Sequence, residues 1–335
     1  MPQFNEVKDL ISWMGAIQAQ EYTMVKWAIG MRLKNPSIKK VEEALSRGDI
    51  LRTHVMRPTW HIVAAEDIRW MIDLSAKRIK SGMNSWAKGL DMSEKLYSKV
   101  NDALIKILEG NKSLSKSEIG EELTKKGVNI DNRPLSLFLS RAEVENIVCS
   151  GVDKGRLQTY ALTDERVAPT KPLHKDEALA KLAFNYFRSH SPATLEDFVW
   201  WSGLSMTEAK HAIHLIQDKL ISEKFISDKL YIHESYVNTI QSEDVFHLMP
   251  SFDEYLISYK SRTHCLALHH YPKAFTNYGI FYPITLHNGS IIGNWKKSSN
   301  KGTINIETSF FEKKTRVGKR LIEKAISNYK SFLEG

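Results

Sequence analysis

Two glutamines separated by one residue, Gln18 and Gln20, are the side chains whose spacing is most informative about chemistry. Residues at i and i+2 lie on opposite sides of an α-helix but on the same face of an extended strand. If both glutamines serve one site, residues 16–20 must therefore form a short strand. An amide can hold a water molecule, a base edge or a phosphate, but it does not act as a base at neutral pH. The two amides can therefore contribute to a reaction only by positioning a bound group, such as a water molecule.

A second group of side chains that could bind a ligand follows on the next predicted strand pair. Alternation places Arg52 and His54 on one face of the first strand. His61 lies on the returning strand, and Arg57 lies at the turn between the strands. Such side chains could contact a phosphate or a substrate base. Cross-strand packing is expected for Trp60. It is also the alternative role for His61. The four residues assigned to DNA binding are Arg52, His54, Arg57 and His61.

Other titratable residues give no pattern of a metal or acid–base site. Asp253 and Glu254 are adjacent, and on the strand predicted for this segment they would point to opposite faces. We expect a structural acceptor there rather than a catalytic pair. Four histidines lack metal-ligand spacing with any cysteine or carboxylate cluster; these are His264, His269, His270 and His287. The sequence predicts no metal ion and no cofactor.

Composition places the chain among basic, cytosolic, globular proteins. Its 335 residues are 42% hydrophobic, enough for two or three packed domains. A formal net charge of +8 favours a polyanionic partner, although many basic proteins bind no nucleic acid. The two cysteines, Cys149 and Cys265, indicate neither a disulfide framework nor a thiolate metal site. No membrane span or signal layout is found, so we expect a cytoplasmic protein.

The elements that must position the glutamines predict a winged helix in residues 1–90. The expected order is helix, strand, helix, helix, strand, wing and strand. Gly15 ends the first helix, Asn35-Pro36 ends the second, and Ser37 caps the third. The helices are expected at 4–13, at 22–33 and from Ser37 past Leu45, and the strands at 16–20, 50–56 and 59–63.

The same pattern recurs in residues 91–170 and 171–240. Each unit contains a capping box, Ser115 to Glu118 in one and Ser205 to Glu208 in the other. In the third unit, the Gly203 turn joins two helices as in a helix-turn-helix. Further expected elements are a helix from Pro134 to Cys149, a strand at 156–162, a linker at 169–172, a helix from Thr194 to Trp201 built on core aromatics (Phe198, Trp200 and Trp201), and a wing at 225–233 turning at 227–229.

Residues 241–335 change character and complete the predicted fold class. Strands are expected within 245–259 and 279–311, with turns at Asn288-Gly289 and at 300–302. These predict a small β-barrel or meander, followed by a basic amphipathic helix at 314–333. The predicted fold is thus α+β and mainly α, with three tandem winged-helix units, a C-terminal small β-barrel and a terminal helix.

Taken in order, five stretches resemble the winged-helix DNA-binding-domain proteins that include the AlkZ-like DNA glycosylases. The resemblance spans nearly the whole chain, and characterised members are bacterial enzymes that remove bulky alkylated bases and unhook interstrand crosslinks. The family's Gln-x-Gln catalytic motif falls on Gln18 and Gln20. Pro58 departs from the family pattern, which has glycine there, and it stiffens the wing. The stretches are residues 14–20, 56–61, 194–203, 248–255 and 279–281.

This resemblance implies a DNA-binding, monofunctional glycosylase for N7- or N3-alkylated purines. Such a base is already cationic and leaves without a general acid, so the glutamine carbonyls need only position a water molecule. No lysine is required, and lyase activity is not expected. The implied partner is double-stranded DNA with alkylated bases, bound by a monomer in the bacterial cytoplasm at the nucleoid, with no membrane partner.

Two alternatives remain at this point. The chain could be a non-catalytic winged-helix DNA-binding protein, such as a transcription factor, or a scaffold for protein interaction. Against a regulator, such proteins usually bind paired half-sites as dimers, and this chain shows no coiled coil or ligand-sensing module. Base release separates the first alternative from an enzyme, and a gel shift separates the second.

Overall fold

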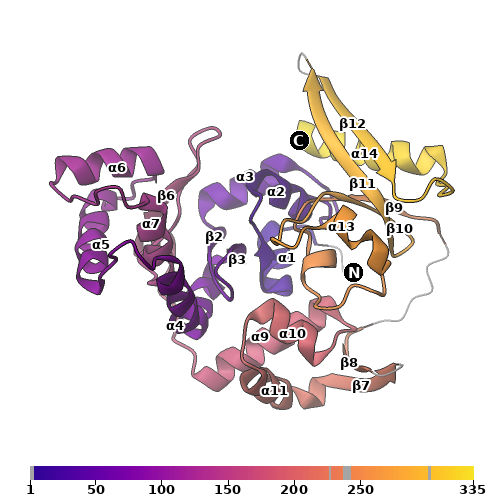
Figure 1. The fold of residues 1–335 in the computed structure, drawn as a ribbon, viewed down its shortest axis with the longest axis horizontal. Helices are drawn as coiled ribbons and strands as arrows, with labels where there is room; N and C mark the ends of the chain where they lie inside the picture. Colours follow the sequence, from indigo (N-terminus) through magenta and orange to yellow (C-terminus); the bar gives the residue numbers. More distant parts are fainter. Residues whose placement is uncertain (1–3, 226–227, 237–242, 301–302) are drawn as a thin grey trace.

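The computed structural model describes residues 4–225, 228–236, 243–300 and 303–335 (Figure 1). Helices and small antiparallel sheets alternate along the chain, so the predicted α+β class is confirmed. Among the described residues, no helix is both long and apolar enough to cross a membrane.

The first group of elements carries the two glutamines and follows the predicted order. Ser37 accepts a hydrogen bond from the Lys40 amide at the start of its helix, and Gly15 ends the first helix at φ 82°. Three antiparallel strands form a sheet in the order β1-β3-β2. The elements are α1 (Val7–Met14), β1 (Ile17–Gln18), α2 (Tyr22–Gly30), α3 (Ile38–Arg47), β2 (Ile50–His54) and β3 (Trp60–Ala64).

The second group contains another three-stranded sheet, in the order β4-β6-β5. The Ser115–Glu118 capping box is present, as predicted. The predicted helix to Cys149 is wrong, because Asn146 adopts φ 59° and the apolar residues after it pair with β6. The elements are η1 (Ala65–Asp67), α4 (Ile68–Trp86), α5 (Glu94–Leu108), β4 (Leu114–Ser115), α6 (Lys116–Lys125), α7 (Leu135–Val144), β5 (Val148–Ser150), β6 (Thr159–Leu162) and α8 (Thr163–Arg166).

The third group has the predicted helices and a two-stranded hairpin. Capping boxes begin α10 and α11, and Gly203 joins them at φ 68°. The hairpin's first strand starts at Leu220, earlier than predicted, and the predicted turn residue Ser227 lies outside the described residues. The elements are α9 (Lys175–His190), α10 (Leu195–Ser202), α11 (Met206–Leu215), η2 (Gln217–Lys219), β7 (Leu220–Phe225) and β8 (Asp228–His233).

The C-terminal part contains an open sheet in the order β12-β11-β10-β9, and within the described residues no closed barrel forms. The Asn288-Gly289 turn joins β10 to β11 as predicted, whereas the 300–302 turn lies partly outside the described residues. The strand predicted through Tyr259 ends at Met249. The elements are β9 (Phe246–Met249), α12 (Glu254–Ile257), η3 (Leu268–His270), α13 (Tyr271–Ala274), β10 (Ile284–His287), β11 (Ser290–Asn300), β12 (Thr303–Phe310) and α14 (Lys319–Glu334).

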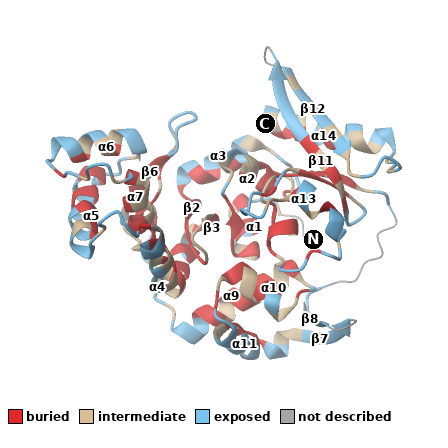
Figure 2. Ribbon diagram, in the orientation of Figure 1, coloured by how far each residue is buried: buried red, intermediate tan, exposed pale blue. Residues whose placement is uncertain are grey.

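The β1-β3-β2 sheet lies between two hydrophobic cores at the centre of the molecule (Figure 2). One core joins α1–α3 to α14 and the C-terminal sheet, and Ile17, Ala19 and Ile62 point into it. The other joins α4 to α9–α11, and Ala16, Leu51 and Val63 point into it. Because side chains alternate along strands, the side chain of residue 18 faces the second core.

The last helix packs tightly against the first group. A Cβ atom added at Gly30 in α2 would lie 2.2 Å from a ring carbon of Phe332 in α14. The absence of a side chain at residue 30 therefore makes room for the C-terminal helix. Phe332 is buried in the same core as the helices that support β1.

Candidate active site

The edge position of β1 determines where the Gln18 backbone points. Gln18 is paired with His61 of β3, while the next residue donates its amide to the Trp60 carbonyl at 2.8 Å. In an antiparallel pair this alternation leaves the Gln18 amide pointing away from β3. It donates instead to the Glu254 carboxylate, Oε1, at 2.5 Å. A residue from α12 thus completes the free edge of the glutamine strand.

Gln18 is 3% exposed, and its side chain is held by the loop that joins β2 to β3. Its Oε1 accepts a hydrogen bond from Arg57 Nη2 at 3.0 Å. His61, on the same sheet face, is 1% exposed, and its Nδ1 lies 3.0 Å from the Thr59 carbonyl oxygen. Burial, reinforced by the positive charge of Arg57, lowers the pKa of His61 to about 3. His61 is therefore neutral at pH 7.

The buried, neutral state of His61 predicts that the protein loses stability in mild acid. An unfolded histidine binds a proton below about pH 6.5, whereas His61 in the folded protein resists protonation down to about pH 3. Stability must therefore fall as the pH falls through this window. We expect the free energy of unfolding to drop by about 2 kcal/mol between pH 7 and pH 5 on this account, measured by urea unfolding.

In a His61→Gln variant, the free energy of unfolding should not show this decrease between pH 7 and pH 5, whatever its value at pH 7. His264→Asn, at an exposed histidine, is the matched control and should keep the wild-type slope. An unchanged slope in His61→Gln would contradict the assignment of a buried neutral imidazole.

Gln20 lies in a different environment from Gln18. The strand ends at Gln18, and Gln20 is exposed in the bend before α2. Glu21, the next residue, caps α2 by accepting the Thr23 amide. The two amides are therefore close in sequence, but one is buried against Arg57 and the other is open to solvent.

Glu254 is a structural acceptor, as expected for this carboxylate pair, but its contact with the glutamine strand was not foreseen from the sequence. Besides the Gln18 amide, its carboxylate accepts hydrogen bonds from Trp201 Nε1 at 3.1 Å and from the Ser258 hydroxyl, and His190 Nε2 lies 3.6 Å away. Burial opposes ionisation, but these partners together hold the pKa of Glu254 at about 2. Its lone pairs are occupied by structural donors, so it positions β1 and is not a free catalytic base.

The neighbouring carboxylate, Asp253, has its own structural role. It caps α12 by accepting the Tyr255 amide at 2.9 Å, and Arg32 holds both of its oxygens at 2.8 Å. Glu254 is the first residue of α12, so the strand predicted for this pair is wrong. An Asp followed by Glu-Tyr-Leu-Ile is an N-cap signal, and it could have revealed the helix.

Arg52 and His54 lie on the opposite face of the sheet from Gln18. The Arg52 guanidinium lies 4.2 Å from the Trp60 ring centroid and donates to Gln158 of the second group at 2.6 Å. The His54 imidazole pairs with the buried Glu143 and contacts the same indole. Trp60 thus packs across the strands as predicted. Of the four predicted DNA-binding residues, the structure places Arg57 and His61 beside Gln18, and Arg52 and His54 away from it.

Arg57 lies where the first and third groups meet. Its guanidinium carbon is 5.8 Å from the ring centroid of Trp200, which is half-buried in α10. The α10–α11 turn packs directly on the loop that joins β2 to β3, since a Cβ at Gly203 would lie 2.8 Å from the Met56 carbonyl oxygen. Burial lowers the pKa of Arg57, opposed by Glu254. Within the described residues Arg57 has no ion pair shorter than 4 Å.

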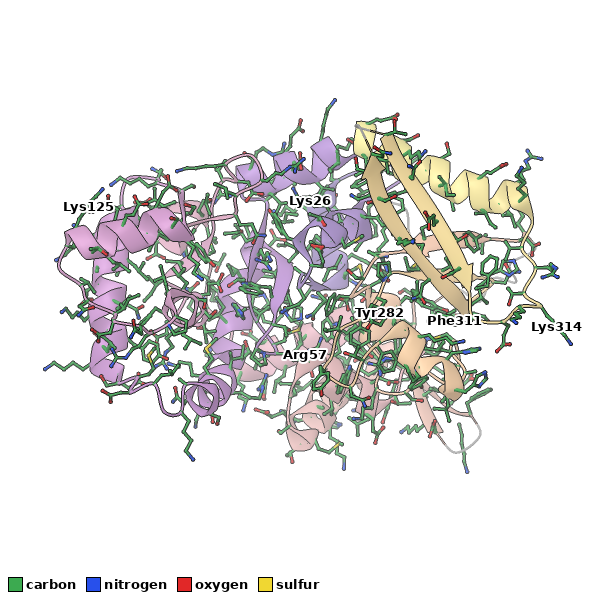
Figure 3. The ribbon with its side chains drawn as sticks, turned by 45° about the horizontal axis from the view of Figure 1, so that its top comes forward. Lys26, Arg57, Lys125, Tyr282, Phe311 and Lys314 are labelled. Atoms are coloured by element: carbon green, nitrogen blue, oxygen red, sulfur yellow. The ribbon has the colours of Figure 1, made fainter. Side chains whose placement is uncertain are left out.

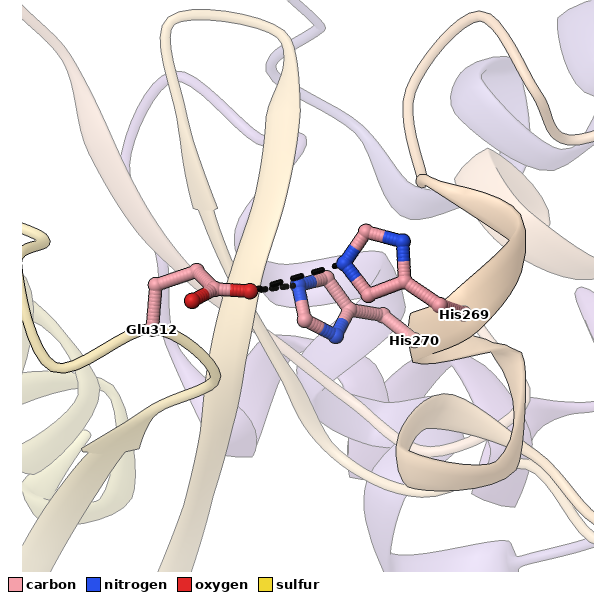
Figure 4. Close-up of side chains that lie close together, drawn as sticks. All are labelled: His269, His270 and Glu312. Carbon is pink, nitrogen blue, oxygen red and sulfur yellow. Dashed lines mark ion pairs between the residues drawn. The ribbon is translucent and has the colours of Figure 1, made fainter.

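Two of the histidines predicted to lack metal-ligand spacing, His269 and His270, lie together beside a carboxylate. His270 Nε2 lies 2.9 Å and His269 Nε2 3.5 Å from Glu312 Oε1 (Figure 4). A metal ion on Nε2 of His270 would place the ring proton on Nδ1, which is buried and has no acceptor among the described residues. The contact therefore fastens η3 to the segment after β12, and Phe311 supports it through the His270 ring.

Comparisons with known proteins give the family to which the chain belongs. The family model described as "DNA glycosylase AlkZ-like" matches residues 11–332. An interstrand DNA cross-link repair glycosylase of Streptomyces sahachiroi is 20% identical over 304 residues, covering 86% of this chain and 81% of the relative. The solved structure of Streptomyces sahachiroi DNA glycosylase AlkZ superposes with a TM-score of 0.80 at 17% identity, covering 98% of this chain and 91% of that one. The chain therefore belongs to the AlkZ-like DNA glycosylase family.

Proposed function

We propose that this protein hydrolyses the N-glycosidic bond of cationic N-alkylated purines in duplex DNA and can unhook interstrand crosslinks built on such bases. The observation that carries this proposal is that the described residues of the site offer no free general acid or base. The amides of Gln18 and Gln20 neither accept nor release a proton at pH 7. The His61 imidazole also stays neutral at this pH. Glu254, the nearest carboxylate, is occupied by structural donors. Such a site suits a base that is already charged.

In the proposed mechanism the two glutamines position the attacking water molecule. Gln20 is exposed, and Gln18 is buried with its side-chain carbonyl held by Arg57. A phosphate competes well for that guanidinium, because a hydrogen bond to a charged acceptor is roughly twice as strong as one to a neutral acceptor. DNA binding would therefore draw Arg57 to the backbone and free the Gln18 carbonyl for water. No lysine enters the scheme, so the product is an intact abasic site.

We further propose how the chain holds DNA. The three groups of helices with small sheets fit tandem winged helices with boundaries near residues 1–90, 91–170 and 171–240. Residues 241–335, an open sheet and a terminal helix, complete the enclosure. One chain of this kind can embrace a duplex as a monomer, on chromosomal DNA in the bacterial cytoplasm. The formal charge of +8 supports a polyanionic partner.

Base release from defined lesions tests the proposal. The protein is incubated with duplex containing N7-methylguanine and with a nitrogen-mustard crosslink, followed by alkaline cleavage of abasic sites. We expect products from cationic lesions and none from a duplex containing uracil, a neutral base. DNA binding without any product would favour a non-catalytic winged-helix protein, and absence of DNA binding would favour a protein scaffold.

Charge reversal at Arg57 tests the proposed phosphate contact. Arg57→Glu should weaken binding to undamaged duplex and reduce the slope of log K against log salt by about one. Lys125→Glu is the matched control, because Lys125 is exposed on α6 at the far end of the molecule (Figure 3). Equal salt slopes for Arg57→Glu and the wild type would remove Arg57 from the interface.

A further inference from the structure

We propose that the loop of residues 275–282 is a base-stacking element, with Tyr278 as the side chain that stacks on a nucleobase of the bound DNA. This inference rests on the proposed DNA substrate and adds a contact that the glutamine site does not supply. Tyr278 is 95% exposed, more than any other large hydrophobic side chain of the described residues. Its flanking residues Ile280 and Tyr282 are also exposed, at 50% and 38%.

The loop is a rigid turn that presents Tyr278 at its tip. The Gly279 amide donates to the Thr276 carbonyl at 3.0 Å, and the Thr276 amide donates to the Ile280 carbonyl at 2.9 Å. Gly279 has φ 78°, a conformation that glycine adopts without strain. The Thr276 hydroxyl accepts the Ile280 amide at 3.2 Å and fixes the turn again. A fixed loop loses little conformational entropy when its aromatic tip meets a ligand.

Aromatic and cationic packing braces the base of the loop. Phe275 and Phe281 close it as a stacked pair, with ring centroids 5.2 Å apart. The Arg262 guanidinium lies 5.0 Å and 5.2 Å from these two rings. Arg262 is 7% exposed and is held by the Leu256 carbonyl through its Nε. The exposed tyrosine is therefore mounted on a packed support.

The same packing connects the loop to the glutamine site. Arg262 lies 5.5 Å from the ring centroid of Trp200, and Arg57 lies 5.8 Å from that ring. Arg57 in turn donates to the Gln18 carbonyl. A short chain of contacts thus runs from the base of the loop through Trp200 to Gln18, so the loop is fixed relative to the glutamine site.

The surroundings of the loop favour a nucleic acid over an apolar protein partner. Lys260 Nζ lies 4.8 Å from the Trp200 ring centroid. Within the described residues, none of the three cations around this ring, Lys260, Arg57 and Arg262, forms an ion pair. On the other side, Tyr282 borders a surface hollow of about 530 Å³ that is also lined by three lysines: Lys273, Lys296 and Lys297. An exposed aromatic ring on a loop whose last residue borders a lysine-lined hollow is suited to stacking on a base while the lysines contact the phosphates.

Fluorescence and binding measured on the full-length protein test this contact without relying on catalysis. The probe is undamaged duplex DNA carrying 2-aminopurine, placed in turn at each position of the footprint. We expect wild-type protein to quench or shift the emission at one position, and Tyr278→Ala to abolish that change. Tyr278→Ala should also bind roughly 5- to 100-fold more weakly, the usual effect of losing one stacked base. Tyr278→Trp should retain both signals.

Tyr236→Ala is the matched control, since Tyr236 is another exposed tyrosine, after β8. It should resemble the wild type in both measurements. Wild-type affinity and emission in Tyr278→Ala, or absence of DNA binding by the wild type, would overturn the inference. If the wild type releases no base but its emission change depends on Tyr278, the proposed glycosylase function fails while the stacking contact stands.

Discussion

Replacing Gln20 or Gln18 with alanine is expected to slow base release by at least about 100-fold while leaving DNA affinity within about threefold of wild type. Removal of one preorganised polar group from an active site typically costs about 10²- to 10³-fold in rate. Gln20→Ala is the cleaner variant, because Gln20 is exposed and its loss should not change the free energy of unfolding. Gln18→Ala removes a buried amide that accepts from Arg57, so a modest loss of stability accompanies it.

Single-turnover rates on an N7-methylguanine duplex, with binding measured separately, distinguish the two effects. Gln217→Ala, at an exposed glutamine after α11, is the control and should release base at the wild-type rate. Gln18→Glu adds a further check, because a carboxylate beside Arg57 would form an ion pair that competes with a phosphate. If both alanine variants release the base at the wild-type rate, the catalytic assignment is wrong.

The largest expected loss of stability follows from Glu254→Ala. This substitution leaves the Gln18 amide, the Trp201 indole and the Ser258 hydroxyl without their acceptor in a dry environment. Removing one member of a buried charged network costs about 3–5 kcal/mol. Because Glu254 also fixes the edge of β1, base release should fall even in protein that remains folded at low temperature. Urea unfolding and excision rates below the unfolding transition measure the two effects.

Glu254 also gives the stability a pH dependence of its own. Its pKa is about 2 in the folded protein, below the ordinary value of 4.5, so its contribution is complete above about pH 4.5 and is lost as the pH falls toward 2. The lowered pKa of Glu254 contributes about 3 kcal/mol to the free energy of unfolding. About 2 kcal/mol of this contribution should be lost between pH 5 and pH 3. Glu254→Gln should flatten this part of the curve, whereas Glu196→Gln, at an exposed position in α10, should not. An unchanged curve in Glu254→Gln would contradict the proposed network.

The local elements were predictable where a side chain marks their ends. Ser37, Ser115 and Ser205 cap helices in the structure as their sequence patterns indicated. The long helix α4 follows a 3₁₀ turn and has no side-chain cap, and α9 begins after an uncommon N-cap, His174. Neither gave a recognisable start signal. The small barrel was predicted from the number of strands in residues 241–335. A barrel closes only if the two edge strands of the sheet pair, and the number of strands does not reveal this pairing.

The candidate site was predictable in part. Five stretches in order, one of them containing Gln18 and Gln20, indicated the family, and the family model confirms that prediction, including the class of DNA glycosylases. The contacts around Gln18 were not predictable, because Glu254 is 236 residues away in the sequence. Alternation along strands correctly separates Arg52 and His54 from His61, but the partners on each face come from other parts of the chain.

The tight fit of Phe332 against Gly30 has a consequence for how the chain folds during synthesis. The core behind β1 includes side chains from the last ninety residues, among them Trp295, Tyr329 and Phe332. The N-terminal elements leave the ribosome first, yet their core stays open until the final helix has been released. We therefore expect nascent chains stalled before residue 319 to remain protease-sensitive near β1. On the same ground, we expect the glutamine site to assemble only after α14 has been synthesised.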